Sequence, residues 1–130
     1  MKLLLGFVAV TVLLSIVSFS PALAQQISHV TISYDSGMDE LCLAAKNCFN
    51  SQSLQITTGT TVTWKNTDQY SHTITSGSPY DKQVGTEFDS GLVSPGNEFS
   101  FTFQDVGTYH YFCEIHPWMR GQIDVINPSS

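Results

Sequence analysis

The sequence is poor in basic residues. Its 130 residues include five Lys and Arg against eleven Asp and Glu, which gives a formal net charge of −6. Proteins that bind nucleic acids present clustered Lys and Arg to the phosphates, so this composition argues against a nucleic-acid partner. The same acidic field favours a cationic partner surface and discourages approach to anionic lipid headgroups.

Internal repeats and low-complexity tracts are also missing from the sequence, which argues against a repeat protein or a disordered linker. A chain of this length suffices for one domain with one hydrophobic core. We expect residues 25–130 to form that single domain, because the first 24 residues have the features of a targeting segment.

The N-terminus has the pattern of a secretory signal peptide. Met1 and Lys2 give a positive start, residues 3–17 form an apolar run, and Ala22-Leu23-Ala24 is a small-x-small cleavage site. We predict cleavage after Ala24 and an extracytoplasmic location, whether periplasmic, cell-surface or secreted. The alternative is an uncleaved N-terminal membrane anchor, for which the apolar run is somewhat short, so we expect no membrane span in the mature chain.

After this segment, apolar residues recur with a period of two, which is typical of half-buried strands. Residues 38–49 interrupt the pattern, and Leu41, Leu43 and the two following alanines favour one helical turn there. We also expect strands over 88–93 and 122–126. The other alternating positions are Val30, Ile32 and Tyr34; Leu54 and Ile56; Val62 and Trp64; His72 and Ile74; and Phe99, Phe101 and Phe103. Seven or eight short strands at this spacing predict an all-β, antiparallel Greek-key sandwich.

Metal-ligating side chains gather in one short stretch near the C-terminus. Cys113, His116 and Met119 stand three residues apart, where an apolar strand pattern runs into a loop. A thiolate, an imidazole and a weakly bound thioether suit copper in a trigonal site, which is completed by a second imidazole. His72, just after a turn-like stretch, is the natural candidate for it. We therefore predict one copper ion bound by His72, Cys113, His116 and Met119.

Strand parity orders the residues before the ligand loop. Alternation directs Tyr109, Tyr111 and Cys113 to one face and His110 and Phe112 to the other. Because Cys113 must point inward to reach a metal, we expect the two tyrosines in the core. His110 then faces outward and is not expected to be a ligand.

The remaining two cysteines lie close together in sequence. If Cys113 binds copper, Cys42 and Cys48 are left in a chain that we expect to be exported to an oxidising compartment, where free thiols are unusual. We expect a disulfide that closes a small loop. The alternative is a redox-active dithiol or a second metal site, to which Met38 would contribute.

These motifs resemble the cupredoxins, the small type 1 (blue) copper proteins. The Cys-x-x-His-x-x-Met spacing is most similar to amicyanin, with a ligand loop shorter than that of plastocyanin. The resemblance covers about residues 54–126 and includes Gly59-Thr60-Thr61-Val62-Thr63-Trp64 and Phe88-Asp89-Ser90-Gly91. It implies a Greek-key β-sandwich of seven to eight strands. The ligand loop holds a single Cys, which excludes a dinuclear copper site.

Two positions depart from the family pattern. Thr73 follows the first ligand His, where related proteins usually have Asn, and its hydroxyl is expected to replace the amide that ties the ligand loops together. Ile115 stands where related loops commonly have Pro, so it brings an additional backbone N–H near the ligand sulfur. We expect Thr73 and Ile115 to support the ligands through these hydrogen-bonding groups.

The resemblance also implies a docking surface. In cupredoxins the edge of the second ligand His reaches the surface within a hydrophobic patch, and here Pro117 and Trp118 follow His116. Trp118 belongs either to this patch or to the core. Phe112 adjoins Cys113 at a position that lies near an electron path in related proteins. We expect a redox donor and a redox acceptor as partners of a monomer.

We therefore expect an exported one-electron carrier rather than an enzyme, since a site with four protein ligands has no open position for a substrate. An extracytoplasmic protein for copper storage or delivery is the alternative. Delivery sites are usually exposed and rich in Met or Cys, whereas Cys113 is expected to be buried. A cell-surface interaction domain that retains a copper site is a third possibility.

Overall fold

The computed structural model describes residues 25–38 and 40–129 as two packed β-sheets with one short helix. The predicted signal peptide lies outside these residues. The strands are β1 (Ile27–Ile32), β2 (Ser53–Thr57), β3 (Thr61–Asn66), β4 (Thr75–Ser76), β5 (Glu98–Thr102), β6 (Gly107–Phe112) and β7 (Arg120–Ile126), and the helix is α1 (Leu41–Ala45). The predicted all-β sandwich and its number of strands are confirmed.

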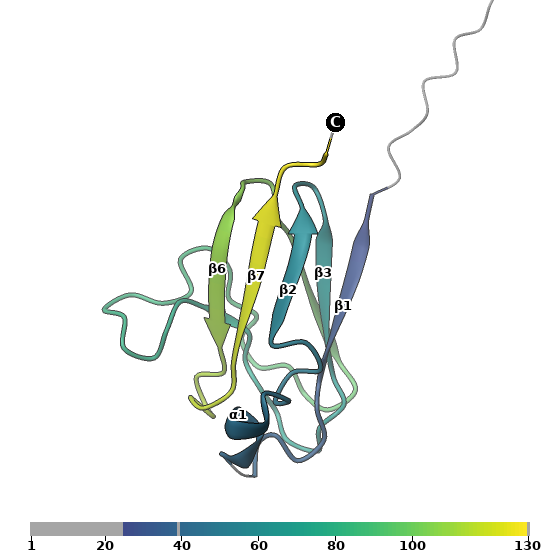
Figure 1. Cartoon of the computed structure of the whole chain (residues 1–130). Helices are drawn as coiled ribbons and strands as arrows, with labels where there is room; N and C mark the ends of the chain where they lie inside the picture. Colours follow the sequence, from purple (N-terminus) through teal and green to yellow (C-terminus); the bar gives the residue numbers. More distant parts are fainter. Residues whose placement is uncertain (1–24, 39, 130) are drawn as a thin grey trace, which may run out of the picture.

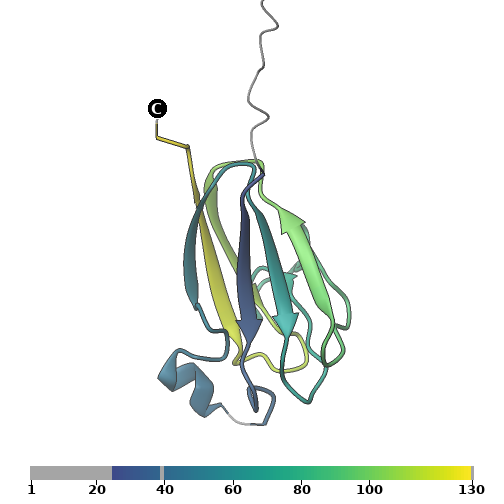
Figure 2. The same ribbon diagram turned by 90° about the vertical axis from the view of Figure 1, so that its right-hand side faces the viewer.

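One sheet has the strand order β1-β3-β5 and the other β2-β7-β6-β4. Figure 1 shows β6, β7 and β2 side by side, and Figure 2 shows the sheet of β1, β3 and β5. The expected antiparallel pairing is found in only part of the two sheets. β1 pairs with β3 in parallel, and so does β2 with β7. In each pair, the chain that connects the two strands passes through the other sheet before it returns. The remaining strand pairs are antiparallel.

The core between the sheets is aromatic. Trp64 of β3 is fully buried and packs against Phe88, Phe99, Phe103 and Tyr111 at centroid distances of 5.4–6.4 Å. Alternation along β3 and β6 sends Trp64 and Tyr111 inward. Replacing a fully buried Trp with Ala typically costs about 3–5 kcal/mol, so this cluster is a main source of the stability that holds the strands in place.

Three details differ from the expected strand pattern. Tyr34 lies beyond β1 and is exposed, because β1 ends at Ile32. Residues 88–93 form isolated bridges with the chain around β4 instead of a strand. Phe112 was expected on the outer face of the sheet but is only 4% exposed, and it adjoins a surface pocket that residues 77–79 and Arg120 also line.

The ends of the strands divide the molecule into two poles. β6 ends and β7 begins at the pole where α1 lies (Figure 1). The β2–β3 turn, which contains Gly59, lies at the opposite pole. α1 belongs to the β1–β2 connection, in which the predicted Cys42–Cys48 disulfide is present. The α1 pole is therefore the end of the sandwich at which the predicted ligand loop is found.

Candidate metal centre

The predicted ligand loop is a closed turn between two neighbouring strands. Cys113 directly follows β6, and its N–H donates to the carbonyl of Met119 at 3.1 Å. The N–H of Met119 in turn donates to the carbonyl of His116 at 2.9 Å. The first bond continues the β6–β7 pairing into the loop, and the second closes the turn between His116 and Met119.

His72 reaches the same place from a different part of the chain. It lies before β4 and exchanges two backbone hydrogen bonds with Val93, at 3.1 and 2.7 Å. Asn66 at the end of β3 is buried and donates from its side chain to the carbonyls of Tyr70 and Val93. The loop that presents His72 is therefore anchored on both sides.

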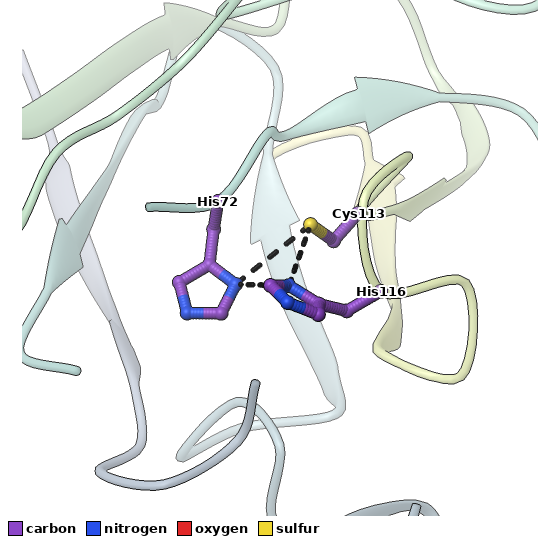
Figure 3. Close-up of side chains that lie close together, drawn as sticks. All are labelled: His72, Cys113 and His116. Atoms are coloured by element: carbon purple, nitrogen blue, oxygen red, sulfur yellow. Dashed lines mark hydrogen bonds between the residues drawn. The ribbon is translucent and has the colours of Figure 1, made fainter. Parts of the chain in front are cut away.

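Three of the predicted ligand atoms converge (Figure 3). The Sγ atom of Cys113 lies 3.7 Å from Nδ1 of His72 and 3.6 Å from Nδ1 of His116, and the two nitrogens are 3.1 Å apart. A circle through three atoms at these separations has a radius of about 2.0 Å, which is close to the length of a transition metal–imidazole bond. The donors therefore already have the spacing of a trigonal metal site.

Burial differs among the predicted ligands. Cys113, His72 and Met119 are 0% exposed, whereas His116 is partly exposed. Burial, followed by the nearby His72, lowers the pKa of His116, so its ring favours the neutral form that binds metal. The site is closed on the side of the core and reaches solvent through His116.

The thiol of Cys113 is prepared to act as a thiolate. Burial raises its pKa, but the hydrogen bond with His72 and the backbone N–H groups of Thr73, His116 and Ile115 outweigh this and lower it. The N–H of Thr73 lies 3.3 Å from Sγ. Because the thiolate is the form that binds metals, this environment favours metal binding.

The hydroxyl of Thr73 links the two ligand segments. It accepts a hydrogen bond from the backbone N–H of Glu114 at 2.8 Å and another from the hydroxyl of Thr75 at 3.0 Å. Thr73 adjoins His72 and Glu114 adjoins Cys113, so this contact holds the His72 segment against the ligand loop.

Asp68 is a functional residue that the sequence interpretation missed. Its Oδ2 atom lies 2.8 Å from Nε2 of His72, on the side of the ring away from the metal position. Burial lowers the pKa of His72, but Cys113 and Asp68 outweigh it and raise the value. Metal-bound histidines commonly pair their second nitrogen with a carboxylate. The spacing of four residues between Asp68 and His72 was the available signal.

The surface residues predicted around the loop have separate positions. Pro117 is exposed, and Ile115 is 48% exposed. Trp118 is half-buried, with its Nε1 donating to the carbonyl of Ser36 at 3.0 Å and its ring 5.3 Å from that of His116. Phe112 is buried, so it does not form part of an exposed surface as predicted.

Comparison with known proteins agrees with this geometry. Residues 43–126 match the family model of copper-binding proteins of the plastocyanin/azurin family. The chain belongs to this family. It is therefore a cupredoxin, and the resemblance found in the sequence is confirmed.

Among its relatives, amicyanin-alpha of Methylorubrum extorquens is 32% identical over 62% of this chain and 66% of its own length. Amicyanin of Paracoccus denitrificans is 32% identical over 62% of this chain and 60% of its own length. The match therefore covers less than two thirds of the length of each of these two amicyanins. Plastocyanin of Scenedesmus fuscus is 35% identical over 59% of this chain and 85% of its own length.

Solved structures show the same fold. A purple cupredoxin from Nitrosopumilus maritimus has 29% identity and a TM-score of 0.64, covering 76% of this chain and 99% of that one. An amicyanin variant with Cu(I) has a TM-score of 0.58 at 24% identity, covering 77% and 82%, which supports the fold alone. Cupredoxins bind one copper ion, and His72, Cys113 and His116 form the candidate ligand cluster, with Met119 in the same loop.

Proposed function

We propose that this cupredoxin is a one-electron carrier whose copper site is formed by His72, Cys113, His116 and Met119. The observation that carries the proposal is the triangle of Sγ and two Nδ1 atoms, which fits a trigonal ion without rearrangement. A copper ion there supplies one-electron chemistry between Cu(I) and Cu(II). Soft sulfur suits the reduced ion and imidazole serves both states, so this donor set supports electron exchange.

The protein contributes a preformed site rather than a reactive one. His72 and Cys113 are fully buried and fixed by backbone hydrogen bonds, so little movement is needed when the oxidation state changes. Four protein ligands leave no coordination position for a substrate, which favours electron transfer over an enzyme activity.

His116 is the proposed point of electron exchange with redox partners. It is the partly exposed ligand, and the exposed Pro117 adjoins it in the loop. An apolar contact at this position brings a partner close to the metal, while the net negative charge of the chain favours a cationic donor or acceptor.

Export is part of the same proposal. Within residues 25–38 and 40–129, the structure contains no helix that could span a membrane. The Cys42–Cys48 disulfide suits an oxidising compartment. Expression with residues 1–24 and mass spectrometry of the secreted or periplasmic product should detect an N-terminus at Gln25.

The test uses the protein loaded with Cu(II). An electron carrier should have an intense visible thiolate-to-copper band, bleach on reduction and recover on oxidation, and lose copper slowly to a chelator. Rapid loss of copper to a Cu(I) chelator, without reversible redox cycling, would instead support storage or delivery. Absence of the band in folded, copper-loaded protein would refute the site.

A further inference from the structure

Part of the β1–β2 connection packs against the metal centre. We call residues 33–48 the capping segment; the structure describes all of them except residue 39. The segment includes α1 and contains the Cys42–Cys48 disulfide. Most of this segment precedes residues 43–126, which match the family model. Its contacts nevertheless lead to both ligand histidines.

One set of contacts leads to His72. The backbone N–H groups of Asp35 and Gly37 donate to the two carboxylate oxygens of Asp68, at 2.9 and 3.0 Å. The same carboxylate holds Nε2 of His72 at 2.8 Å. The orientation of the His72 ring therefore depends on where the capping segment places these two N–H groups.

A second set leads to His116. The carbonyl of Ser36 accepts the indole N–H of Trp118, whose ring packs against His116. Ser36 is itself buried, and its hydroxyl donates to the carbonyl of Cys48 at 3.0 Å. The sulfur of Cys42 lies 3.8 Å from the Ser36 carbonyl oxygen, so the disulfide directly adjoins the group that anchors Trp118.

Gly37 stands where the two sets of contacts meet. A Cβ atom at this position would lie 3.1 Å from Cε1 of His116, 3.2 Å from Cε1 of His72 and 3.2 Å from Cβ of Tyr70. The backbone of Gly37 lies outside the left-handed region, so its conformation does not require glycine. Its lack of a side chain instead permits close approach to both imidazoles.

We propose that the capping segment is a positioning element of the copper centre and that Gly37 is the residue through which it limits the movement of both imidazoles. The proposal rests on the proposed copper function. Cu(I) and Cu(II) prefer different ligand geometries, and His116 lies on a loop that is partly exposed. A backbone packed against both rings, and closed by a disulfide, keeps their separation the same in the two oxidation states.

The decisive variant is Gly37→Ala. A methyl group there presses on both rings, so the visible band and the EPR parameters of the Cu(II) form should change, the potential should shift, and Cu(I) should be lost to a chelator about tenfold faster. Gly59→Ala is the control. It introduces an alanine at a φ of +85° at the opposite pole, so it should lower the melting temperature but leave spectrum, potential and copper loss unchanged.

A double variant tests the disulfide. Cys42→Ser with Cys48→Ser should retain an intense visible band but also lose Cu(I) about tenfold faster, because the capping segment that holds Asp68 and Trp118 is no longer closed by a covalent bond. Trp118→Phe removes the hydrogen bond to Ser36 while keeping an aromatic ring beside His116, and it should change the EPR parameters. This variant decides the question if Gly37→Ala does not fold.

A measurement without copper separates the two proposals. In metal-free wild-type protein, NMR should detect nuclear Overhauser contacts from the Gly37 Hα protons to the Cε1 protons of His72 and His116. If wild-type protein forms no intense copper band, the proposed function fails, whatever these contacts show. If the band forms but folded Gly37→Ala matches wild type in spectrum, potential and copper loss, the positioning role is overturned.

Discussion

The Nε2 atom of His72 lies 2.8 Å from the Oδ2 atom of Asp68, and both side chains are fully buried. Asp68 also accepts backbone N–H groups from Asp35, Gly37 and Gln69. These bonds satisfy a carboxylate that burial alone would disfavour. The pair connects the capping segment to a ligand ring, and it determines which nitrogen of His72 is available to the metal.

Asp68→Asn should weaken copper binding. An amide keeps the shape of the side chain but loses the negative charge that orients the His72 ring and increases its basicity. Loss of such an outer partner typically lowers metal affinity about 10- to 100-fold. Competition with a chromophoric chelator measures this. Asp105→Asn, in the exposed turn before β6, is the matched control and should bind copper as wild type does. Equal affinity in the two variants would contradict the assigned role.

The same carboxylate should produce a pH-dependent stability in the metal-free protein. Burial raises the pKa of Asp68, but the hydrogen bonds from Gly37, His72, Gln69 and Asp35 lower it below the ordinary value of 3.8. Its stabilisation is therefore fully present above pH 3.8 and is lost as the pH falls through the lower, folded-state pKa.

Urea unfolding of metal-free wild type and Asp68→Asn measures this effect. The difference between their free energies of unfolding should be larger at about pH 6 than at about pH 3, because below the ordinary pKa of 3.8 the unfolded chain binds a proton at this carboxyl group more readily than the folded protein does. A difference that stays constant over this range would show that the charge of Asp68 does not stabilise the fold.

Cys113→Ser should abolish the intense visible band while leaving a folded protein. The band requires a thiolate bound to Cu(II), and Ser supplies only a hydroxyl of similar size. Absorption spectra of the copper-loaded variant, with circular dichroism as the check on folding, measure this. If the intense band persisted, Cys113 would not be a copper ligand.

Met119→Leu, unlike Cys113→Ser, should keep the intense visible band, and it should shift the reduction potential. Met119 is 0% exposed, so a leucine of similar volume should be accommodated in the same space. The intense band should remain because the thiolate is unchanged, and the potential should shift because the axial ligand tunes it. An unchanged potential, measured by protein-film voltammetry, would remove Met119 from the ligand set.

The part of the site that could be predicted from sequence is the part encoded locally. Cys113, His116 and Met119 lie within one loop, where ligand type and spacing are visible together. His72 was found because a trigonal site needs a second imidazole. Alternation along β6 correctly sent Tyr111 to the core and His110 outward.

The remaining parts depend on contacts between distant segments. Phe112 is only 4% exposed although it lies on the outer face of its sheet, and strand parity does not reveal such burial. The contact of Gly37 with both histidines depends on the conformation of an irregular connection. Parallel pairing of β1 with β3 requires knowledge of which connections cross between the sheets. Periodicity predicts strands and faces, but it does not predict how loops pack.

Ile115→Pro should lower the reduction potential while keeping the intense visible band. The backbone N–H of Ile115 contributes to the low pKa of the Cys113 thiol, together with those of Thr73 and His116. Hydrogen bonds to the sulfur withdraw electron density and weaken its donation to Cu(II) more than to Cu(I), so they raise the potential. Proline has no N–H and therefore removes one of these bonds.

Ile115→Ala is the matched control, because it shortens a half-exposed side chain and keeps the N–H. Its potential should stay near the wild-type value, which would assign the effect of proline to the missing hydrogen bond rather than to side-chain packing. Voltammetry of the two variants, with EPR spectra to verify an intact site, makes the comparison. A potential equal to or above wild type in correctly folded Ile115→Pro would show that this N–H does not tune the copper centre.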